Sequence, residues 1–155
     1  MTPRTLSVTD TVQDYLRQVG FREPELLQRL REETLRLSGA NMLLAPEQGQ
    51  LMALLARLIG VASYLEVGTF TGYSALALVL ALGPSSRIVT CDIDPDTTRI
   101  AQRYWCEAGA GDRIELRVGP ALSTLDGMLA QGKRGAFDMA FIDADKENLL
   151  AYYER

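Results

Sequence analysis

The chain of 155 residues contains no histidine and only two cysteines. Without an imidazole it has no Ser-His-Asp or Cys-His catalytic group and no zinc site built on histidine. Cys91 and Cys106 each lie within an apolar-periodic segment, where a disulfide is unnecessary. We expect both to be reduced and buried, as small apolar side chains of a cytoplasmic protein.

Basic residues and long apolar runs are also scarce. Sixteen Lys and Arg against 20 Asp and Glu give a formal net charge of −4, so no excess of positive charge attracts nucleic acid or an anionic membrane. No apolar run approaches the length of a membrane span, and segment 1–30 is too rich in charged residues for a signal peptide. These features predict a cytoplasmic protein with neither nucleic acid nor a membrane as partner.

The remaining composition, 47% hydrophobic and 23% charged, is typical of one globular domain. We expect an N-terminal helical cap region at 1–45 and a second region at 46–155, within a single structural domain. Helices are predicted from the 3.6-residue period, and strands from short apolar runs. The helices are Thr11–Val19, Pro24–Leu37 (ended by Gly39), Pro46–Ile59, Tyr73–Leu82, Pro95–Ala108, Ala121–Gln131 and one from Glu147 onward; the strands are Ser63–Val67, Arg87–Asp92, Ile114–Val118 and Phe137–Asp143.

Repeated strand–helix units with short connections predict an α/β fold. We expect a Rossmann-like doubly wound parallel sheet with helices on both faces and N-terminal accessory helices. Most of the strands are apolar runs, as in a sheet that is covered on both faces. In such sheets ligands bind at the carboxyl ends of the strands. The polar residues that close each strand are therefore the candidates for a functional site.

The most informative segment, residues 65–76, closes the first strand. An apolar run ends at Val67, Glu66 precedes that end, and Gly68 and Gly72 bracket a turn before a helix. This arrangement lets a nucleoside-type cofactor lie against bare backbone. The turn lacks the third glycine of a dinucleotide fingerprint and the Lys-Ser/Thr pair of a P-loop. It therefore favours S-adenosylmethionine over NAD or ATP.

Acidic residues close the first two strands. Glu66 lies inside an apolar strand, and a buried acid needs a hydrogen-bond donor. It either caps nearby backbone N–H groups or contacts the cofactor, and the adjacent glycine turn favours the cofactor. Asp94 precedes Pro95, which suits the first position of a helix, so Asp94 is predicted to be the N-cap. Asp92 is left at the strand tip, 20 residues after Gly72. An acid at about this separation along the sequence is expected to bind ribose hydroxyls.

The last two strands end less distinctively. The third is followed by Pro120 and Ala121, which either start a helix without chemistry or contact an adenine edge. The fourth runs directly into Asp143, with Asp145 and Lys146 close behind. One interpretation is a solvated strand end with a helix cap. The other is catalytic, because a carboxylate there suits Mg²⁺, and a lysine whose pKa is lowered by the cation could act as a base.

Together, segments 65–76, 91–95, 119–122 and 141–148 resemble the class I S-adenosylmethionine-dependent O-methyltransferases. More narrowly, the Gly-Thr-Phe-Thr-Gly-Tyr-Ser turn and the Phe-Ile-Asp-Ala-Asp-Lys segment are similar to those of the cation-dependent caffeoyl-CoA and catechol O-methyltransferase group, particularly its small bacterial members. The resemblance also takes in Met42 and the helix start at 46–50, and so covers nearly all of residues 40–155.

The resemblance implies roles for individual residues. Asp143 would border the cofactor and bind both the metal and the reacting oxygens of the substrate, and Lys146 would be the general base. The metal would be Mg²⁺, or alternatively Mn²⁺ or Ca²⁺. Asp92 would hold the ribose and Ala121 would lie beside the adenine. The other residues implied at the cofactor, most of them around its methionine part, are Met42, Glu66, Gly68, Thr69 and Ser74.

Members of the group continue past the position of Arg155 into a strand whose end supplies an Asp-Asn pair to the same metal. We therefore expect a sheet truncated at the C-terminus, and a chain that alone is inactive, poorly stable and oligomeric or aggregated. For the complete protein the resemblance implies a homodimer that methylates a small phenolic substrate, a vicinal dihydroxy-aromatic of the catechol or caffeoyl type. The alternatives are a fragment or degenerate homologue that binds S-adenosylmethionine without catalysis, and a methyltransferase for a macromolecule, of which the acidic charge disfavours nucleic acid.

Overall fold

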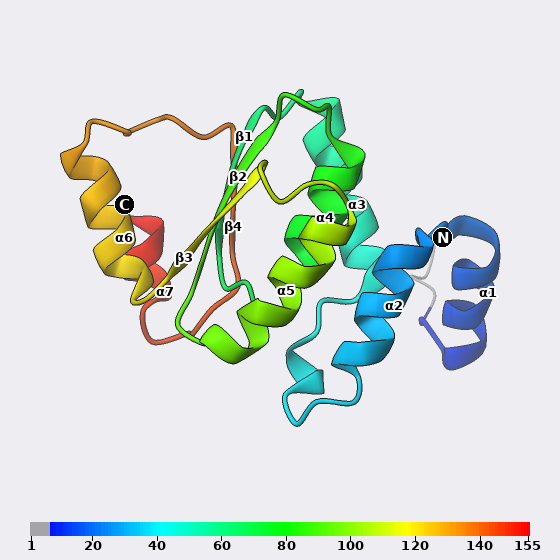
Figure 1. The fold of residues 1–155 in the computed structure, drawn as a ribbon. Helices are drawn as coiled ribbons and strands as arrows, with labels where there is room; N and C mark the ends of the chain where they lie inside the picture. The colour runs from blue at the N-terminus through cyan, green and yellow to red at the C-terminus, as the bar shows by residue number, and fades with distance from the viewer. Residues whose placement is uncertain (1–6) are drawn as a thin grey trace, which may run out of the picture.

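A computed structural model describes residues 7–155 as an α/β fold built on one parallel sheet (Figure 1). The sheet has four strands in the order β3-β2-β1-β4, and every neighbouring pair is parallel. The elements in chain order are α1 (Asp10–Gly20), α2 (Glu25–Thr34), the short 3₁₀ helix η1 (Ala40–Met42), α3 (Pro46–Leu58), β1 (Ser63–Val67), α4 (Tyr73–Ala81), β2 (Arg87–Asp92), α5 (Pro95–Glu107), β3 (Ile114–Val118), α6 (Ala121–Ala130), β4 (Met139–Ile142) and α7 (Leu149–Tyr153).

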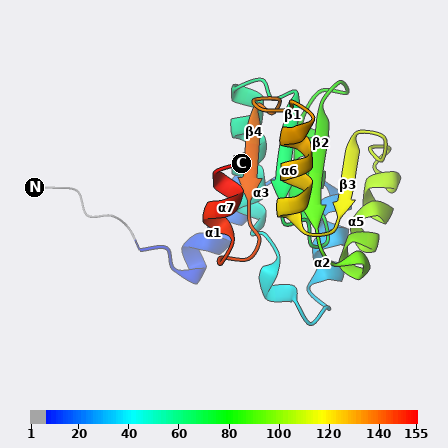
Figure 2. The same cartoon turned by 90° about the vertical axis from the view of Figure 1, so that its left-hand side faces the viewer.

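Helices cover both faces of the sheet (Figures 1 and 2). Helices α6 and α7 lie on one face, while α3, α4 and α5 lie on the other, with α2 packed outside α4. Helix α4 is almost entirely apolar and is buried from Tyr73 to Val79, because it lies between the sheet and these outer helices. Leu27 and Leu30 of α2 belong to the same core as α4, so the segment before residue 45 packs directly on the rest of the domain.

The strand order explains why the polar strand ends meet. The chain moves outward from β1 to β2 and β3, then crosses to the other side of β1 for β4, so the order reverses between β1 and β4. A ligand crevice is expected at such a reversal, at the carboxyl ends of the strands. Segment 35–45, with η1, passes below these strand ends in Figure 2.

Several predicted boundaries were wrong. Helix α2 ends at Thr34 and not at Leu37, because the amides of Arg36 and Leu37 bond carbonyls three residues back, and Gly39 instead precedes η1. Strand β4 begins at Met139, two residues late, because the carboxylate of Asp138 accepts the amides of Ala62 and Ser63 at the start of β1.

Two further expectations need correction. Helix α7 begins at Leu149, because Asp145 accepts the amide of Asn148 and holds the preceding residues in a turn. Both cysteines are free, as expected, but Cys106 is exposed on α5 and only Cys91 is buried. Within residues 7–155, no helix is both long and apolar enough to cross a membrane.

Candidate functional site

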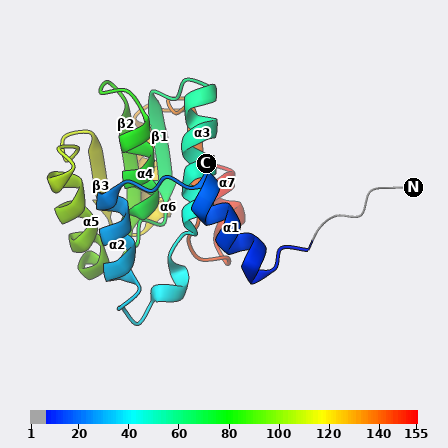
Figure 3. The same ribbon diagram turned by 90° about the vertical axis from the view of Figure 1, so that its right-hand side faces the viewer.

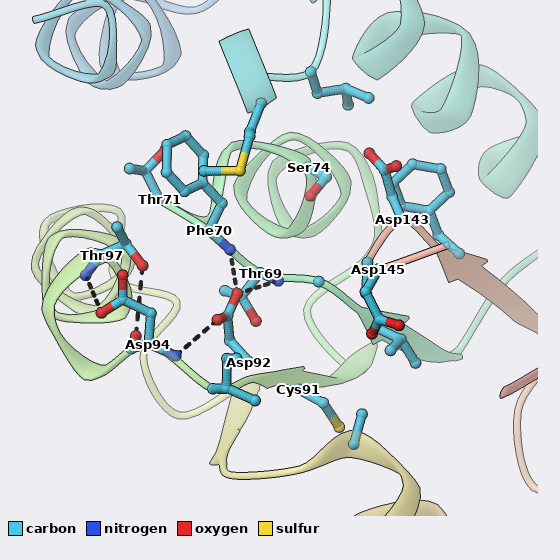
Figure 4. Close-up of a pocket in the computed structure, with 18 of the residues that line it drawn as sticks. Thr69, Phe70, Thr71, Ser74, Cys91, Asp92, Asp94, Thr97, Asp143 and Asp145 are labelled. Carbon is cyan, nitrogen blue, oxygen red and sulfur yellow. Dashed lines mark hydrogen bonds between the residues drawn. The ribbon is translucent and has the colours of Figure 1, made fainter. Parts of the chain in front are cut away.

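A cavity of about 1030 Å³ opens at the carboxyl ends of the strands (Figure 4). Its walls come from the glycine turn after β1, the ends of β2 and β3, the segment after β4, and residues 41–45 below them. All but one of the site residues predicted from the sequence line this cavity: Met42, Gly68, Thr69, Ser74, Asp92, Ala121, Asp143 and Lys146. Glu66 is the exception, because it lies buried behind the wall.

The turn after β1 is held by Asp92 at the end of β2. One carboxylate oxygen of Asp92 accepts the amides of Thr69 at 2.9 Å and Phe70 at 2.6 Å, and the other accepts the amide of Asp94 at 2.9 Å (Figure 4). Phe70 has a positive φ of 51°, which is uncommon for a residue with a side chain. The bonds from Asp92 stabilise that conformation. Asp92 is therefore placed both to shape the turn and to face a ligand in the cavity.

Asp94, two residues later, is the N-cap of α5. Its carboxylate accepts the amide of Asp96 at 2.8 Å and that of Thr97 at 3.4 Å, and these bonds lower its pKa. The prediction that Asp94 caps the helix and Asp92 is left at the strand tip is confirmed in geometry. Pro95 fixes the first residue of α5, so Asp94 immediately before it caps the helix. Asp92, two residues earlier, is left to hold the turn.

Glu66 is fully buried in β1. One carboxylate oxygen accepts the hydroxyl of Thr90 at 2.7 Å, and the Thr90 oxygen lies 2.6 Å from the hydroxyl of Thr69 in the turn. The other oxygen has no partner among residues 7–155, and within that range the carboxylate caps no backbone N–H group. Burial raises the pKa of Glu66 to about 7, although hydroxyls from Ser74 and Thr90 oppose the shift. Glu66 thus supports the turn from beneath.

Asp143 and Lys146 follow β4 and lie at the cavity wall. The amide of Asp143 donates to Val67 at 2.8 Å, which continues the β1–β4 pairing by one residue. The carboxylate of Asp143 lies 3.6 Å from the ammonium of Lys146, and both side chains are exposed. The structure therefore brings together Asp143, the predicted metal ligand, and Lys146, for which the role of general base stays a prediction.

The described residues do not complete a metal site. Nowhere in 7–155 do three or more Asp, Glu, Cys or His side chains converge as metal ligands would. Asp143 contributes a single carboxylate, and Asp145 is already engaged: it accepts the Tyr152 hydroxyl at 2.6 Å and both the amide and the side-chain N–H of Asn148. Mg²⁺ takes six oxygen ligands, of which several are usually waters and one or two are protein carboxylates. The lone carboxylate of Asp143, without a cluster of ligands around it, does not by itself define a Mg²⁺ site among residues 7–155.

Sequence reasoning missed two residues at the site. Asp145 was counted with the acidic cluster, but its bonds to Tyr152 and Asn148 show that it anchors α7 beside the cavity. The cluster of Asp145 with Asn148 three residues later could have indicated this turn. Tyr73, the first residue of α4, also lines the cavity, and its hydroxyl donates to Glu23 at 2.6 Å. No local pattern links residues so distant in sequence.

Comparisons with known proteins agree with this geometry. Catechol O-methyltransferase domain-containing protein 1 of Mus musculus is 48% identical over 141 residues, which are 91% of this chain and 54% of the mouse protein. Caffeoyl-CoA O-methyltransferase of Eucalyptus gunnii is 37% identical over 154 residues, 98% of this chain and 62% of the plant enzyme. The chain thus spans a little over half the length of these curated relatives.

A solved structure of an O-methyltransferase also resembles this chain. The O-methyltransferase TomG from Streptomyces achromogenes, involved in tomaymycin synthesis and crystallised in complex with S-adenosylmethionine, superposes with a TM-score of 0.78 at 32% sequence identity. The match covers 93% of this chain and 64% of TomG. The sequence profile of the O-methyltransferase family matches residues 17–155. The chain therefore belongs to the O-methyltransferase family.

Proposed function

We propose that the complete protein is an S-adenosylmethionine-dependent O-methyltransferase that acts on a small-molecule hydroxyl. The observation that carries this proposal is the single cavity into which the glycine turn, Asp92, Asp143 and Lys146 all face. Supporting it are the family membership and the S-adenosylmethionine complex of TomG, which shares the fold.

The cavity suits S-adenosylmethionine, which supplies an electrophilic methyl group when bound. Gly68, with a φ of 103°, lines the cavity, and its lack of a side chain lets the segment after β4 lie close to the turn at the cavity wall. Asp92 faces the same space with one of its roughly four lone-pair sites left after its three backbone bonds, so it can accept a ribose hydroxyl. Ala121 at the start of α6 leaves room for an adenine ring beside it. The partnerless oxygen of Glu66 lies just behind this wall.

On the other side of the cavity, Lys146 is the proposed general base and Asp143 its neighbour. A base must reach the proton it removes, and both residues line the cavity in the segment after β4. Figure 4 shows Asp143 across the cavity from Asp92. The acceptor hydroxyl would then lie between the cofactor turn and Lys146. Holding the two reactants in line accounts for much of the rate acceleration in such transfers. The proposed acceptor is a vicinal dihydroxy-aromatic of the catechol or caffeoyl type.

Dependence on Mg²⁺ or Mn²⁺ is a separate part of the proposal. Asp143 at a strand tip beside Lys146 supports it, but residues 7–155 contribute this one carboxylate, so the remaining ligands must come from elsewhere in the complete protein. The test is methyl transfer from radiolabelled S-adenosylmethionine to catechol and to caffeoyl-CoA, with Mg²⁺ and with EDTA. We expect transfer that stops with EDTA. Undiminished turnover in EDTA would exclude cation dependence, and absence of transfer to either acceptor would refute the proposed substrate class.

A second candidate is a protein that binds S-adenosylmethionine without catalysis. Two observations favour it: the carboxylate of Asp143 pairs with the ammonium of Lys146, and the described part of the chain contains no cluster of metal ligands. Cofactor binding by calorimetry together with the transfer assay separates the two candidates. Binding without transfer, in the complete protein, would favour the second.

We also propose that the complete protein is a homodimer. The support is an exposed apolar face on α3, where residues at helical spacing point away from the core. Its members are Leu51, Leu54, Leu55 and Leu58, with Ile59 just beyond the helix. Exposed apolar faces of this kind are typical of protein–protein contacts. Light scattering tests the proposal, and a monodisperse monomer would contradict it.

A further inference from the structure

The hydroxyls of the two residues that flank Gly72 contact helix α2 and the segment just before it. The hydroxyl oxygen of Thr71 lies 2.8 Å from that of Thr34, the last residue of α2, and both threonines are buried. On the other side of Gly72, the hydroxyl of Tyr73 donates to Glu23 at 2.6 Å. Helix α2 packs against α4 (Figure 3). Its last residue therefore reaches Thr71 in the turn, and Glu23, two residues before α2, reaches Tyr73 at the start of α4.

Each of these contacts is itself fixed. The hydroxyl of Thr34 also donates to the carbonyl of Leu30 at 2.8 Å, which orients the hydroxyl. The carboxylate of Glu23 is bound by two nitrogens of Arg31, Nη2 at 2.8 Å and Nε at 3.1 Å, in a pair whose glutamate side chain is only 7% exposed. A bidentate, partly buried pair of this kind holds its partners in one geometry. The contacts therefore form a rigid support behind the turn.

Gly72 needs such support. It has a φ of 78° and is the N-cap of α4, but it has no side chain with which to cap the helix. A larger residue is excluded, because a Cβ there would come within 2.9 Å of the Trp105 ring. Glycine is the residue with the greatest backbone freedom. Asp92 holds the turn at Thr69 and Phe70, and the backbone of Gly72 bonds Thr69 and Trp105. The side chains of Thr71 and Tyr73 add the contacts that fix the two residues on either side of Gly72.

We propose that Glu23 and Thr34 are positioning residues for the cofactor, which hold Thr71, Tyr73 and hence Ser74 in place before the cofactor binds. Thr71, Tyr73 and Ser74 line the cavity, whereas Glu23 and Thr34 do not. The inference rests on the proposed binding of S-adenosylmethionine at this turn. A preformed turn binds more tightly because less conformational entropy is lost on binding.

The chain offers a matched control on the other side of α2. The hydroxyl of Tyr104 on α5 donates to Glu33 at 2.8 Å, and Glu33 is also bound by Arg103, so this Tyr–Glu–Arg group has the same composition. Tyr104 does not line the cavity. Tyr73→Phe and Tyr104→Phe thus remove equivalent hydrogen bonds, of which only the first supports the turn.

The test measures the affinity of the full chain for S-adenosylhomocysteine by calorimetry, and amide hydrogen exchange over residues 70–76. We expect Thr34→Val and Tyr73→Phe each to raise Kd at least about fivefold, the lower end of typical coupling between sites, and to speed exchange in the turn. Thr34→Ser, which keeps the hydroxyl, and Tyr104→Phe should bind like the wild type. If the wild type binds but Thr34→Val and Tyr73→Phe bind no worse than Tyr104→Phe, the inference is wrong. If the wild type itself does not bind, the proposed function fails first.

Discussion

The backbone of Gly68 lies directly against the backbone of Asp143. A Cβ at position 68 would overlap the carbonyl oxygen of Asp143 and would lie 3.2 Å from the amide nitrogen of Ala144. The glycine turn after β1 and the acidic segment after β4 are therefore in contact. This contact sets how far Asp143 lies from the glycine turn after β1. Gly68 is therefore required by the structure on both sides of the cavity, at this turn and at the segment after β4.

Gly68→Ala should therefore lower both stability and cofactor affinity. The φ of 103° disfavours any side chain, and the overlap with Asp143 adds to that strain. We expect a loss of about 2–4 kcal/mol in the free energy of unfolding. Gly132→Ala is the matched control, because Gly132 also has a positive φ, of 75°, but open space where its Cβ would be. It should lose only about 1–2 kcal/mol and keep its affinity. Urea unfolding and calorimetry measure both, and equal effects of the two variants would contradict the role of this contact.

Stability should fall as pH rises from about 4.3 to about 7. Burial raises the pKa of Glu66 to about 7 in the folded chain, against roughly 4.3 when unfolded. Between these values the unfolded chain has released the proton that the folded chain still holds, so each increase in pH favours unfolding. The total loss from Glu66 is on the order of 3 kcal/mol.

Glu66→Gln should remove this slope, since the amide does not titrate. Urea unfolding at pH 5 and pH 8 provides the measurement. Glu115→Gln, at an exposed position on β3, controls for the loss of one carboxylate and should keep the wild-type slope. Parallel pH profiles for wild type and Glu66→Gln would show that Glu66 does not titrate in this range.

Lys146 should matter for turnover and not for cofactor binding. In the complete protein, Lys146→Gln is expected to lower kcat by about 10²–10⁴-fold, the usual contribution of a general base, with little change in the Kd for S-adenosylhomocysteine. The other lysine, Lys133, is exposed in the connection between α6 and β4, and Lys133→Gln should leave kcat unchanged. A kcat for Lys146→Gln within a factor of about two of wild type would remove Lys146 from the proposed role, since that is far below the contribution of a general base.

The central part of the fold was predictable because its signals are local. The strands β1 and β2 are apolar runs bounded by turns, and the structure gives them the predicted limits. Asp94 was identifiable as a cap because Pro95 follows it immediately. Parallel strands bring their carboxyl ends together, so the grouping of Asp92 with Asp143 followed from the fold class alone.

The remainder depends on contacts between residues that are far apart in sequence. Nothing near Glu23 indicates that it binds the hydroxyl of Tyr73, and the apolar surroundings of Cys106 did not reveal that its side chain faces solvent. The role of Asp92 was only half visible. Its position suggested a ribose, whereas its bonds to the amides of Thr69 and Phe70 require the structure of the turn.

The most direct test of the account is a calorimetric titration of S-adenosylhomocysteine into wild type, Asp92→Ala and Asp94→Ala. The central claim is that the cavity at the strand ends holds S-adenosylmethionine through Asp92. Asp92→Ala removes a charged acceptor worth roughly 1.5–3 kcal/mol per hydrogen bond and also releases the turn, so binding should be sharply weakened. Asp94→Ala should cost about 1 kcal/mol of stability through the lost cap and retain its affinity. Equal loss of binding in the two variants, or no binding by the wild type, would contradict the account.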